Sequence, residues 1–288
     1  MNSRQAAAFR RDVWQYWKKH GRHGLPWRKT RNPYRILVSE VMLQQTQAPR
    51  AVEKYKEFLK AFPTIHALAK ASLTRVLKVW SGLGYNRRAK YLHDAMRIIV
   101  ARHGGRVPND AAALRTLPGI GPYTASAVRV FAFNELDTLI ETNVRTAFIH
   151  YFWVFHESNG RGGHGTVDDA EILPIAKRVA KGQDPKKWHW ALMDYGAYLK
   201  RSGVRINARS AHYMKQSKFE GSLRQLRGAI LREFHLGPHT RHALTMRCHL
   251  IASGVRARRS NMGQMEKALA GLDRDGLVKK KKGKWAIA

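Results

Sequence analysis

Apolar side chains recur three and four positions apart through most of the first 217 residues, a spacing typical of amphipathic helices. Val13 and Trp17 open this series, and Asn32 followed by Pro33 forms a capped helix start. No convincing alternation of apolar and polar residues predicts a strand in this part. The spacing predicts helices over residues 12–19, 34–47, 50–61, 65–70, 73–80, 87–102, 111–116, 123–133, 143–155, 170–179 and 185–200.

The pattern changes near Phe219. Amphipathic helices continue, but two short apolar runs around a lysine–glycine turn then end the sequence and predict a β-hairpin. Three helices followed by a hairpin form the outline of a winged helix, whose wing can touch the DNA backbone. The predicted elements are helices over residues 223–234, 239–253 and 261–273 and a hairpin over residues 276–288.

This change of pattern divides the chain into two predicted domains, residues 1–217 and residues 218–288. The lysine run over residues 279–282 has two interpretations. It is either a solvated basic tail or a wing, in which Lys280 and Lys281 contact the DNA backbone.

The composition points to a polyanionic partner. Lysine and arginine number 53 against 20 acidic residues, for a formal net charge of +33. We expect nucleic acid before membrane, with adaptation to an unusual cytoplasm as the alternative. No apolar run approaches the roughly 18–20 residues needed to span a bilayer, and the N-terminus lacks an apolar signal core. We therefore expect a cytoplasmic, nucleoid-associated protein with no membrane partner.

Cysteine usage limits the possible cofactors. Cys248 is the only cysteine, so an internal disulfide framework and a four-cysteine metal or iron–sulfur site are excluded. The histidines show no cluster at metal-ligand spacing. We expect no metal and no cofactor.

A glycine-rich turn, LPGIGPYTA over residues 117–125, is the most informative motif. Two glycines around one apolar residue allow a sharp turn with exposed amides, and Pro122 suits the first turn of the next helix. Such amides and the positive end of a helix dipole bind phosphate. With a preceding helix capped by Asn109 or Asp110, this predicts a helix-hairpin-helix clamp, the alternative being an ordinary turn. The predicted DNA contacts are Leu117, Gly119, Ile120, Gly121 and Thr124.

Glu40 is out of place in its predicted helix. It lies four residues after Ile36 and three before Leu43, and therefore on their apolar face. A carboxylate there is costly unless it is paired or works as a general acid, although a solvated or salt-bridged side chain is the commoner case. Gln44 and Gln47 extend the same stripe with amide groups suited to base edges.

Several segments together carry a family resemblance. They are LPWR (25–28), SEVMLQQTQ (39–47), WSGLGY (80–85) with Arg88 and Leu92, the turn at 117–124, ETNVR (141–145) and ALMDYGA (191–197). In collinear order over roughly residues 10 to 200, they resemble the helix-hairpin-helix (HhH-GPD) DNA glycosylase superfamily, and most closely its MutY-type adenine glycosylases. The resemblance implies a mainly α, endonuclease III-like helical fold, to which the winged-helix-like module is appended.

The resemblance also implies catalytic roles. Glu40 matches the glutamate that protonates the departing base and then helps to activate water, which requires a base flipped into a pocket nearby. Tyr123 stands where strand-cutting relatives have a lysine, so a monofunctional glycosylase without efficient lyase activity is expected. Asn143 matches an asparagine that supports the acidic pair.

Four departures from the family pattern stand out. The second carboxylate, usually aspartate, is Glu141, which keeps the charge but is one methylene longer. The four cysteines of the usual iron–sulfur loop are missing from residues 197–217. That region must then be ordered by packing, and its lysines and arginines are candidates for phosphate contacts. We expect the winged-helix-like module to stand in place of the Nudix-like domain that helps this family to read 8-oxoguanine.

The fourth departure concerns the wedge that replaces the flipped base. The second tyrosine of the family's Gly-Leu-Gly-Tyr-Tyr stretch is Asn86 here, while Tyr85 remains. The wedge function is therefore assigned to Tyr85, Gln45 or Asn86. Together with Gln44 and Arg88 these residues form the predicted DNA-contacting set around the wedge.

Three functions remain open. The first is a monomeric, monofunctional glycosylase for duplex DNA, acting first on adenine opposite guanine or 8-oxoguanine. Uracil, thymine or hypoxanthine mispairs and alkylated or crosslinked bases are the other substrates within that class. The second is a catalytically silent DNA-binding protein with a decayed site. The third is a transcription regulator built on residues 219–288, which leaves the first 217 residues without a role.

Overall fold

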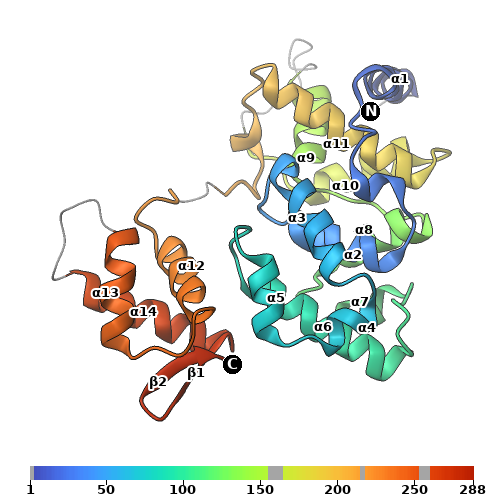
Figure 1. The fold of residues 1–288 in the computed structure, drawn as a ribbon. Helices are drawn as coiled ribbons and strands as arrows, with labels where there is room; N and C mark the ends of the chain where they lie inside the picture. Colours follow the sequence, from blue (N-terminus) through green and yellow to red (C-terminus); the bar gives the residue numbers. More distant parts are fainter. Residues whose placement is uncertain (1–2, 155–164, 215–217, 253–259) are drawn as a thin grey trace. The chain divides into compact units, whose positions relative to one another are not determined.

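The computed structural model describes residues 3–154, 165–214, 218–252 and 260–288, and these ranges are mainly helical (Figure 1). The chain forms two compact units, each assembled from separate stretches of sequence. This division does not coincide with the expected boundary at residue 217, so an independent domain over residues 218–288 stays a prediction. The first unit contains Met1–Leu37, Asn109–Arg115 and Ile120–Lys215, and the second contains Val38–Pro108, Thr116–Gly119 and Gln216–Ala288.

The first unit is built from helices at both ends of its sequence range. α2 begins in this unit and continues into the second, and π-helical turns over Arg129–Phe133 and His150–Val154 extend α8 and α9. The helices are α1 (Ser3–His20), α2 (Pro33–Leu43), α7 (Ala111–Arg115), α8 (Pro122–Val128), α9 (Thr142–Ile149), α10 (Asp169–Ala180) and α11 (Pro185–Arg201).

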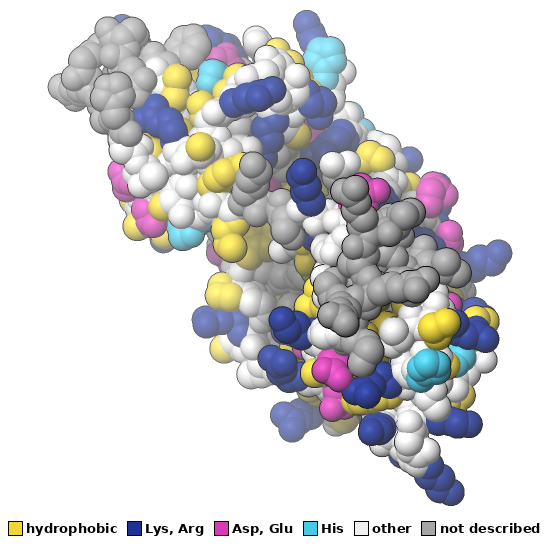
Figure 2. All heavy atoms as spheres, turned by 90° about the vertical axis from the view of Figure 1, so that its left-hand side faces the viewer, with side chains coloured by type: hydrophobic (Ala, Val, Ile, Leu, Met, Phe, Trp, Pro, Cys, Tyr) yellow, Lys and Arg dark blue, Asp and Glu magenta, His cyan; other side chains and the backbone are white. Residues whose placement is uncertain are grey.

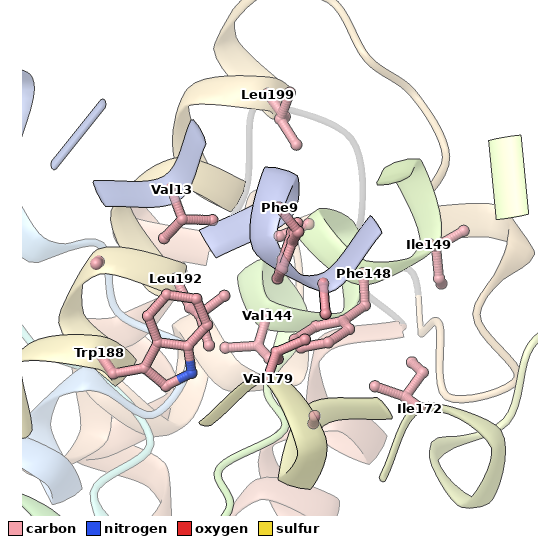
Figure 3. Packing of buried hydrophobic residues seen from close by; sticks show 14 of the residues in the cluster. Phe9, Val13, Val144, Phe148, Ile149, Ile172, Val179, Trp188, Leu192 and Leu199 are labelled. Atoms are coloured by element: carbon pink, nitrogen blue, oxygen red, sulfur yellow. The ribbon is translucent and has the colours of Figure 1, made fainter. Parts of the chain in front are cut away.

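The core of the first unit forms around Phe9 of α1 (Figure 3). The Phe9 ring lies 5.1 Å from Phe148 of α9 and 6.2 Å from Trp188 of α11, measured between ring centroids. Val144 and Leu192 fill the space beside them, and all five side chains are buried. Because each large buried side chain adds about 1.5–3 kcal/mol, this cluster holds α9 and α11 firmly against α1.

The second unit joins central helices of the sequence to its C-terminal helices. Thr64 and Ser72 cap α4 and α5 by accepting hydrogen bonds from backbone amides three residues on. The elements that follow α2 are α3 (Ala48–Ala61), α4 (Ile65–Lys70), α5 (Leu73–Trp80), α6 (Arg87–His103), α12 (Leu223–Phe234), α13 (Arg241–Ala252), α14 (Ser260–Arg274), β1 (Val278–Lys281) and β2 (Lys284–Ile287).

The C-terminal residues form the expected three helices and hairpin. β1 and β2 pair antiparallel, with Lys280 opposite Trp285. Lys282 and Gly283 at the turn have φ angles of 47° and 77°, the left-handed pair that suits a tight hairpin. The winged-helix outline is confirmed.

Most predicted helices agree with the structure to within a few residues; the expected ends at residues 155 and 253 lie outside the described residues. Two predicted bounds are wrong. α1 begins at Ser3 rather than at residue 12, because its buried apolar face already includes Ala6 and Phe9.

α2 ends at Leu43, and residues 44–47 form a turn rather than a further helical turn. Gln45 has a left-handed φ of 55°, through which a right-handed helix does not continue, and Arg88 caps the carbonyls of Val41 and Met42 at the helix end. No helix in the described ranges is long and apolar enough to cross a membrane.

Candidate functional site

Glu40 lies in a helix that is buried on nearly every side. Asn32 caps α2 by accepting a hydrogen bond from the Arg35 amide at 3.1 Å, as expected. All side chains from Ile36 to Met42 are buried, so the helix has no distinct polar face there. The Glu40 side chain is among them, at 9% exposure. A carboxyl placed in such surroundings is suited to acid chemistry rather than to solvation.

The turn after α2 changes the predicted role of its glutamines. Gln44 and Gln47 no longer share the helical stripe of Glu40, because the helix has ended. Gln45 has a left-handed φ of 55°, which is uncommon for a residue other than glycine, and its side chain is exposed. Backbone strain of this kind concentrates at functional sites. A DNA contact by these residues stays a prediction.

Arg88 holds this turn to the loop before α6. Its Nη1 donates to the carbonyls of Val41 and Met42, both at 2.9 Å, and to the carbonyl of Gln44. Its Nη2 donates to the carbonyl of Gly84 at 3.2 Å. Burial lowers the pKa of Arg88 to about 10. The guanidinium therefore caps the C-terminal end of α2, and its predicted contact with DNA stays untested.

Two cavities adjoin these loops within the second unit. They measure about 410 and 460 Å³, and Gln45, Tyr85 and Asn86 line both. Arg224 of α12 lines both as well and lies over the rings of Tyr85 and Phe219, at 5.0 and 5.4 Å from their centroids. It also donates to the Tyr85 hydroxyl. The candidate wedge residues thus share their surroundings with a helix of the C-terminal module.

A buried ion cluster accompanies this contact. Asp275, whose side chain is 5% exposed, binds Arg87 of α6 at 2.5 Å and also Arg227 of α12. Burial opposes ionisation of Asp275, but the two guanidinium groups outweigh it and hold the pKa of the carboxyl below its usual value. The sequence pattern did not reveal Arg224 or Asp275, because nothing local marks either of them.

The glycine turn has the expected helix-hairpin-helix form. Asp110 caps α7 by accepting from the Ala113 amide at 2.7 Å. Gly119 has a φ of 75°, and a Cβ there would lie 2.8 Å from Cβ of Tyr91, so glycine is required. Leu117, Ile120 and Thr124 are buried. Any DNA contact of this turn would therefore use its backbone, and that contact stays a prediction.

Glu141 caps the start of α9 with its side chain. Its Oε1 accepts from the amides of Asn143 and Val144 at 2.9 and 3.0 Å. Its Oε2 accepts from Nδ2 of Asn143 at 3.2 Å. These three donors fix the position of the carboxylate at the positive end of the helix. Lys200 of α11 donates to Oδ1 of Asn143 at 2.9 Å, a contact that the sequence pattern did not predict.

Gly196 allows α9 to lie this close to α11. A Cβ at Gly196 would be 1.9 Å from the carbonyl oxygen of Asn143. Lys200 follows four residues later and hence lies on the same face of α11. That spacing is the one sequence signal that could have placed Lys200 beside the start of α9.

Hydrogen bonds join residues 197–214, the described part of the cysteine-free segment, to other parts of the first unit. Thr146 donates to Asn207 at 2.7 Å, and the Val167 amide donates to the Arg209 carbonyl at 2.6 Å. Residues 197–217 contain no cysteine, so they do not fit a cysteine-ligated cluster. Over the described ranges, no three histidine, cysteine or acidic side chains are grouped to hold a metal ion.

Two further family segments meet in the first unit. Arg28 of the LPWR segment forms a double hydrogen bond with Asp194 of the ALMDYGA segment, at 2.6 and 2.9 Å. Arg22 joins the same carboxylate, whose side chain is 1% exposed. Burial opposes ionisation of Asp194, but the two arginines outweigh it and hold its pKa below the usual value. These segments thus have a structural role.

Three predicted residues remain, namely Tyr123 in the first unit and the two wing lysines in the second. Tyr123 is half-buried on α8, directly after Pro122. Lys280 and Lys281 are exposed on β1, where they are available to a phosphate backbone. On the face shown in Figure 2, lysine and arginine side chains are spread widely and acidic ones are fewer.

Comparison with known proteins places this architecture. The family model for the HhH-GPD superfamily of base excision DNA repair proteins matches residues 38–191, more than half of the chain. The chain belongs to this superfamily. The matched range includes Glu40, Tyr123 and Glu141 together with the glycine turn.

Known relatives within the superfamily are adenine DNA glycosylases. The protein of Mycobacterium tuberculosis is 38% identical over 186 residues, covering 63% of this chain and 58% of the relative. The protein of Mycolicibacterium smegmatis is 33% identical over 235 residues, covering 75% of this chain and 76% of the relative. The chain therefore spans less than two thirds of the first relative and about three quarters of the second.

Solved structures of the superfamily agree with the fold. A thermostable thymine-DNA glycosylase matches with a TM-score of 0.58 and 26% identity, covering 67% of this chain and 87% of that one. A trapped endonuclease III–DNA covalent intermediate matches with a TM-score of 0.53 and 18% identity, covering 71% of this chain and 89% of that one. The expected endonuclease III-like fold is confirmed.

Proposed function

We propose that this chain is a DNA glycosylase that hydrolyses the N-glycosidic bond of adenine paired with guanine or 8-oxoguanine in duplex DNA. The observation that carries the proposal is the carboxylate of Glu141, held at the start of α9 by two backbone amides and Asn143. The buried carboxyl of Glu40 lies in the same family match. The adenine DNA glycosylases among the relatives support adenine as the excised base.

The two carboxyl groups have different tasks in this mechanism. Protonated Glu40 donates its proton to the leaving base as the bond to C1′ breaks and the bonding electrons pass to the base. Ionised Glu141 stabilises the oxocarbenium-like sugar that forms. Water then adds to C1′ and loses a proton to Glu40, which restores the acid.

No lyase step follows in this proposal. Tyr123 carries no amine that could form a Schiff base with the abasic sugar. Borohydride added during turnover should therefore trap little or no protein on abasic DNA. Efficient trapping would show that another amine of the chain performs lyase chemistry.

Duplex DNA is the proposed partner, bound by a monomer in association with the nucleoid. The formal net charge of +33 supports this assignment, as do the exposed lysines of the wing. Light scattering of the protein with and without a duplex should give one protein chain per DNA. A stable dimer would show that the protein does not bind DNA as a monomer.

Single-turnover excision on a panel of labelled duplexes tests the activity, with alkali to cleave abasic sites. The panel contains A·8-oxoG, A·G, U·G, T·G, hypoxanthine·T and an alkylated purine. Glu40→Gln should remove excision and keep DNA affinity, because the amide cannot deliver a proton. Glu53→Gln, a charge-matched change at an exposed site, should excise normally.

The outcomes separate the alternatives. Excision of A·8-oxoG and A·G supports the proposal. Excision of T·G instead would favour a thymine glycosylase, the activity named for the matched thermostable structure. Tight binding without excision of any duplex would favour a silent DNA-binding protein.

A further inference from the structure

Lys200 occupies an unusual position for a lysine. It lies in the last turn of α11, within residues 197–217, where the cysteines of the family's iron–sulfur loop are missing. Its side chain is half-buried, and its Nζ donates to Oδ1 of Asn143 at 2.9 Å. A lysine that served as a phosphate contact would extend into solvent instead.

The donors and acceptors around Asn143 fit only one orientation of its amide. An ammonium can only donate, so Lys200 fixes Oδ1 of the amide toward itself. Nδ2 is thereby left to donate to Oε2 of Glu141, at 3.2 Å. The hydrogen bonds therefore run from the ammonium of Lys200 through the Asn143 amide to the carboxylate of Glu141.

Without Lys200, the amide could turn over. Its carbonyl oxygen would then face the carboxylate of Glu141, and the hydrogen bond would be replaced by repulsion. With Lys200 in place, the positive charge at Oδ1 also polarises the amide and strengthens its Nδ2 donor. Lys200 therefore acts on the carboxylate through Asn143.

Lys200, Asn143 and Glu141 form a hydrogen-bonded array. Other charged groups around this array determine its response to pH. Arg145 follows Glu141 by four residues on α9 and binds Asp169 of α10 at 2.6 and 2.7 Å. His212 lies 3.7 Å from the same aspartate. Burial lowers the pKa of Lys200, Glu141 acts to raise it, and Arg145 acts to lower it further. Lys200 and Glu141 are thus electrostatically coupled.

We propose that Lys200 is a positioning residue for excision, which fixes the Asn143 amide and thereby holds the carboxylate of Glu141 aimed at the sugar. This inference rests on the proposed glycosylase function. It assigns to a residue of the cysteine-free segment a task at the acid site instead of a contact with phosphate.

Single-turnover excision as a function of pH tests the role. Lys200→Gln should lower the rate about tenfold near neutral pH, as expected for a catalytic group that is slightly misplaced. The difference in rate between Lys200→Gln and the parent protein should narrow at high pH, because burial lowers the pKa of Lys200 and the parent lysine also loses its charge there. Lys200→Arg should retain most activity, and Lys177→Gln, at an exposed lysine of α10, should match the parent protein.

DNA affinity separates positioning from phosphate binding. For a positioning residue, the Kd and its salt dependence should be unchanged in Lys200→Gln. A weaker Kd, a salt slope reduced by about 0.9 and an unchanged rate would identify a phosphate contact and overturn the proposal. An equal loss of rate at every pH, with no recovery in Lys200→Arg, would also overturn it.

A double-mutant cycle in urea tests the coupling without any need for activity. Lys200→Gln and Glu141→Gln should be clearly non-additive in their effects on unfolding, since each removes one end of the same array. Additive effects would overturn the proposal even if the protein excises adenine. If the two changes are strongly coupled but the protein excises no base, the interaction of Lys200 with Glu141 is supported and the proposed glycosylase function is contradicted.

Discussion

Glu141 shows how a glutamate side chain is accommodated at the start of a helix. Its carboxylate turns back over the start of α9 and accepts three hydrogen bonds, two from amides and one from Asn143. The additional methylene relative to aspartate is thus taken up by a helix-capping geometry. The same geometry fixes where the negative charge lies.

Glu141→Gln should lower single-turnover excision by about 10²–10³-fold while the Kd for DNA stays within about twofold. The amide keeps nearly the same size but loses the charge that stabilises the sugar cation. Comparison of rates and of Kd with those of Glu53→Gln checks this. Unchanged excision would mean that another group carries the charge.

Asp194 contributes to stability in a pH-dependent manner. Its folded-state pKa lies below the usual value, so its contribution is complete above about pH 4 and is lost as the pH falls through the folded-state pKa. Asp194→Asn should therefore lower the free energy of unfolding by about 3 kcal/mol at pH 7, because two arginines lose their partner.

Urea denaturation of both proteins from pH 7 to pH 3 measures this difference. The difference in free energy of unfolding between the parent protein and Asp194→Asn should become smaller at low pH, where the parent carboxylate is also neutralised. A gap that stays constant with pH would show that the charge of Asp194 is not what stabilises the fold.

The two helices that carry the carboxyl groups are capped by opposite charges. The C-terminal carbonyls of α2 accept from the guanidinium of Arg88, and the N-terminal amides of α9 donate to the carboxylate of Glu141. Each charge suits the dipole of the helix end that it meets. Both helix ends are thus defined by a side chain rather than left to fray.

Arg88→Met should destabilise the chain by about 2–4 kcal/mol, because several buried carbonyls lose their donor while the aliphatic volume is kept. Arg35→Met, at an exposed position of α2, serves as the control and should change little. Urea denaturation gives both values. Equal stability of the two variants would show that water replaces the guanidinium at no cost.

Gly196→Ala should separate α9 from α11, since the new Cβ would overlap the Asn143 carbonyl. We expect a loss of about 3 kcal/mol of stability, together with slower excision. Gly24→Ala is the matched control, because open space surrounds Gly24. Thermal denaturation of both variants decides the matter, and an unchanged Tm for Gly196→Ala would contradict the close approach.

Charge dominates the behaviour of the whole molecule. With a formal net charge of +33, association with any duplex should weaken steeply as salt is added. The exposed lysines of β1 offer a way to assign part of this effect to the wing.

Lys280→Gln combined with Lys281→Gln should reduce the slope of log K against log salt by up to about 1.8, if each lysine neutralises one phosphate. Lys18→Gln combined with Lys19→Gln removes the same charge from exposed positions of α1 and should reduce it less. Fluorescence anisotropy from 50 to 300 mM salt supplies the slopes. Equal slopes for the two double variants would remove the wing from the DNA interface.

Local patterns in the sequence were sufficient for most of the helices, the hairpin and the family motifs. Apolar spacing, capping residues and glycine turns act over a few positions, so they can be recognised without knowing the fold. The end of α2 was missed because the apolar stripe was followed through Gln47, whereas the group that caps the helix end, Arg88, comes from another helix and leaves no local signal.

The tertiary structure alone decided which distant side chains share a site. Lys200 meets Asn143 across 57 residues, Arg28 meets Asp194 across 166, and Arg224 meets Tyr85 across 139. Apart from the spacing of Gly196 and Lys200, no local spacing encodes such pairs, because they depend on how whole helices pack. The sequence thus identified Glu40 and Glu141 as candidates for the chemistry, and packing determined the groups that hold Glu141 in place.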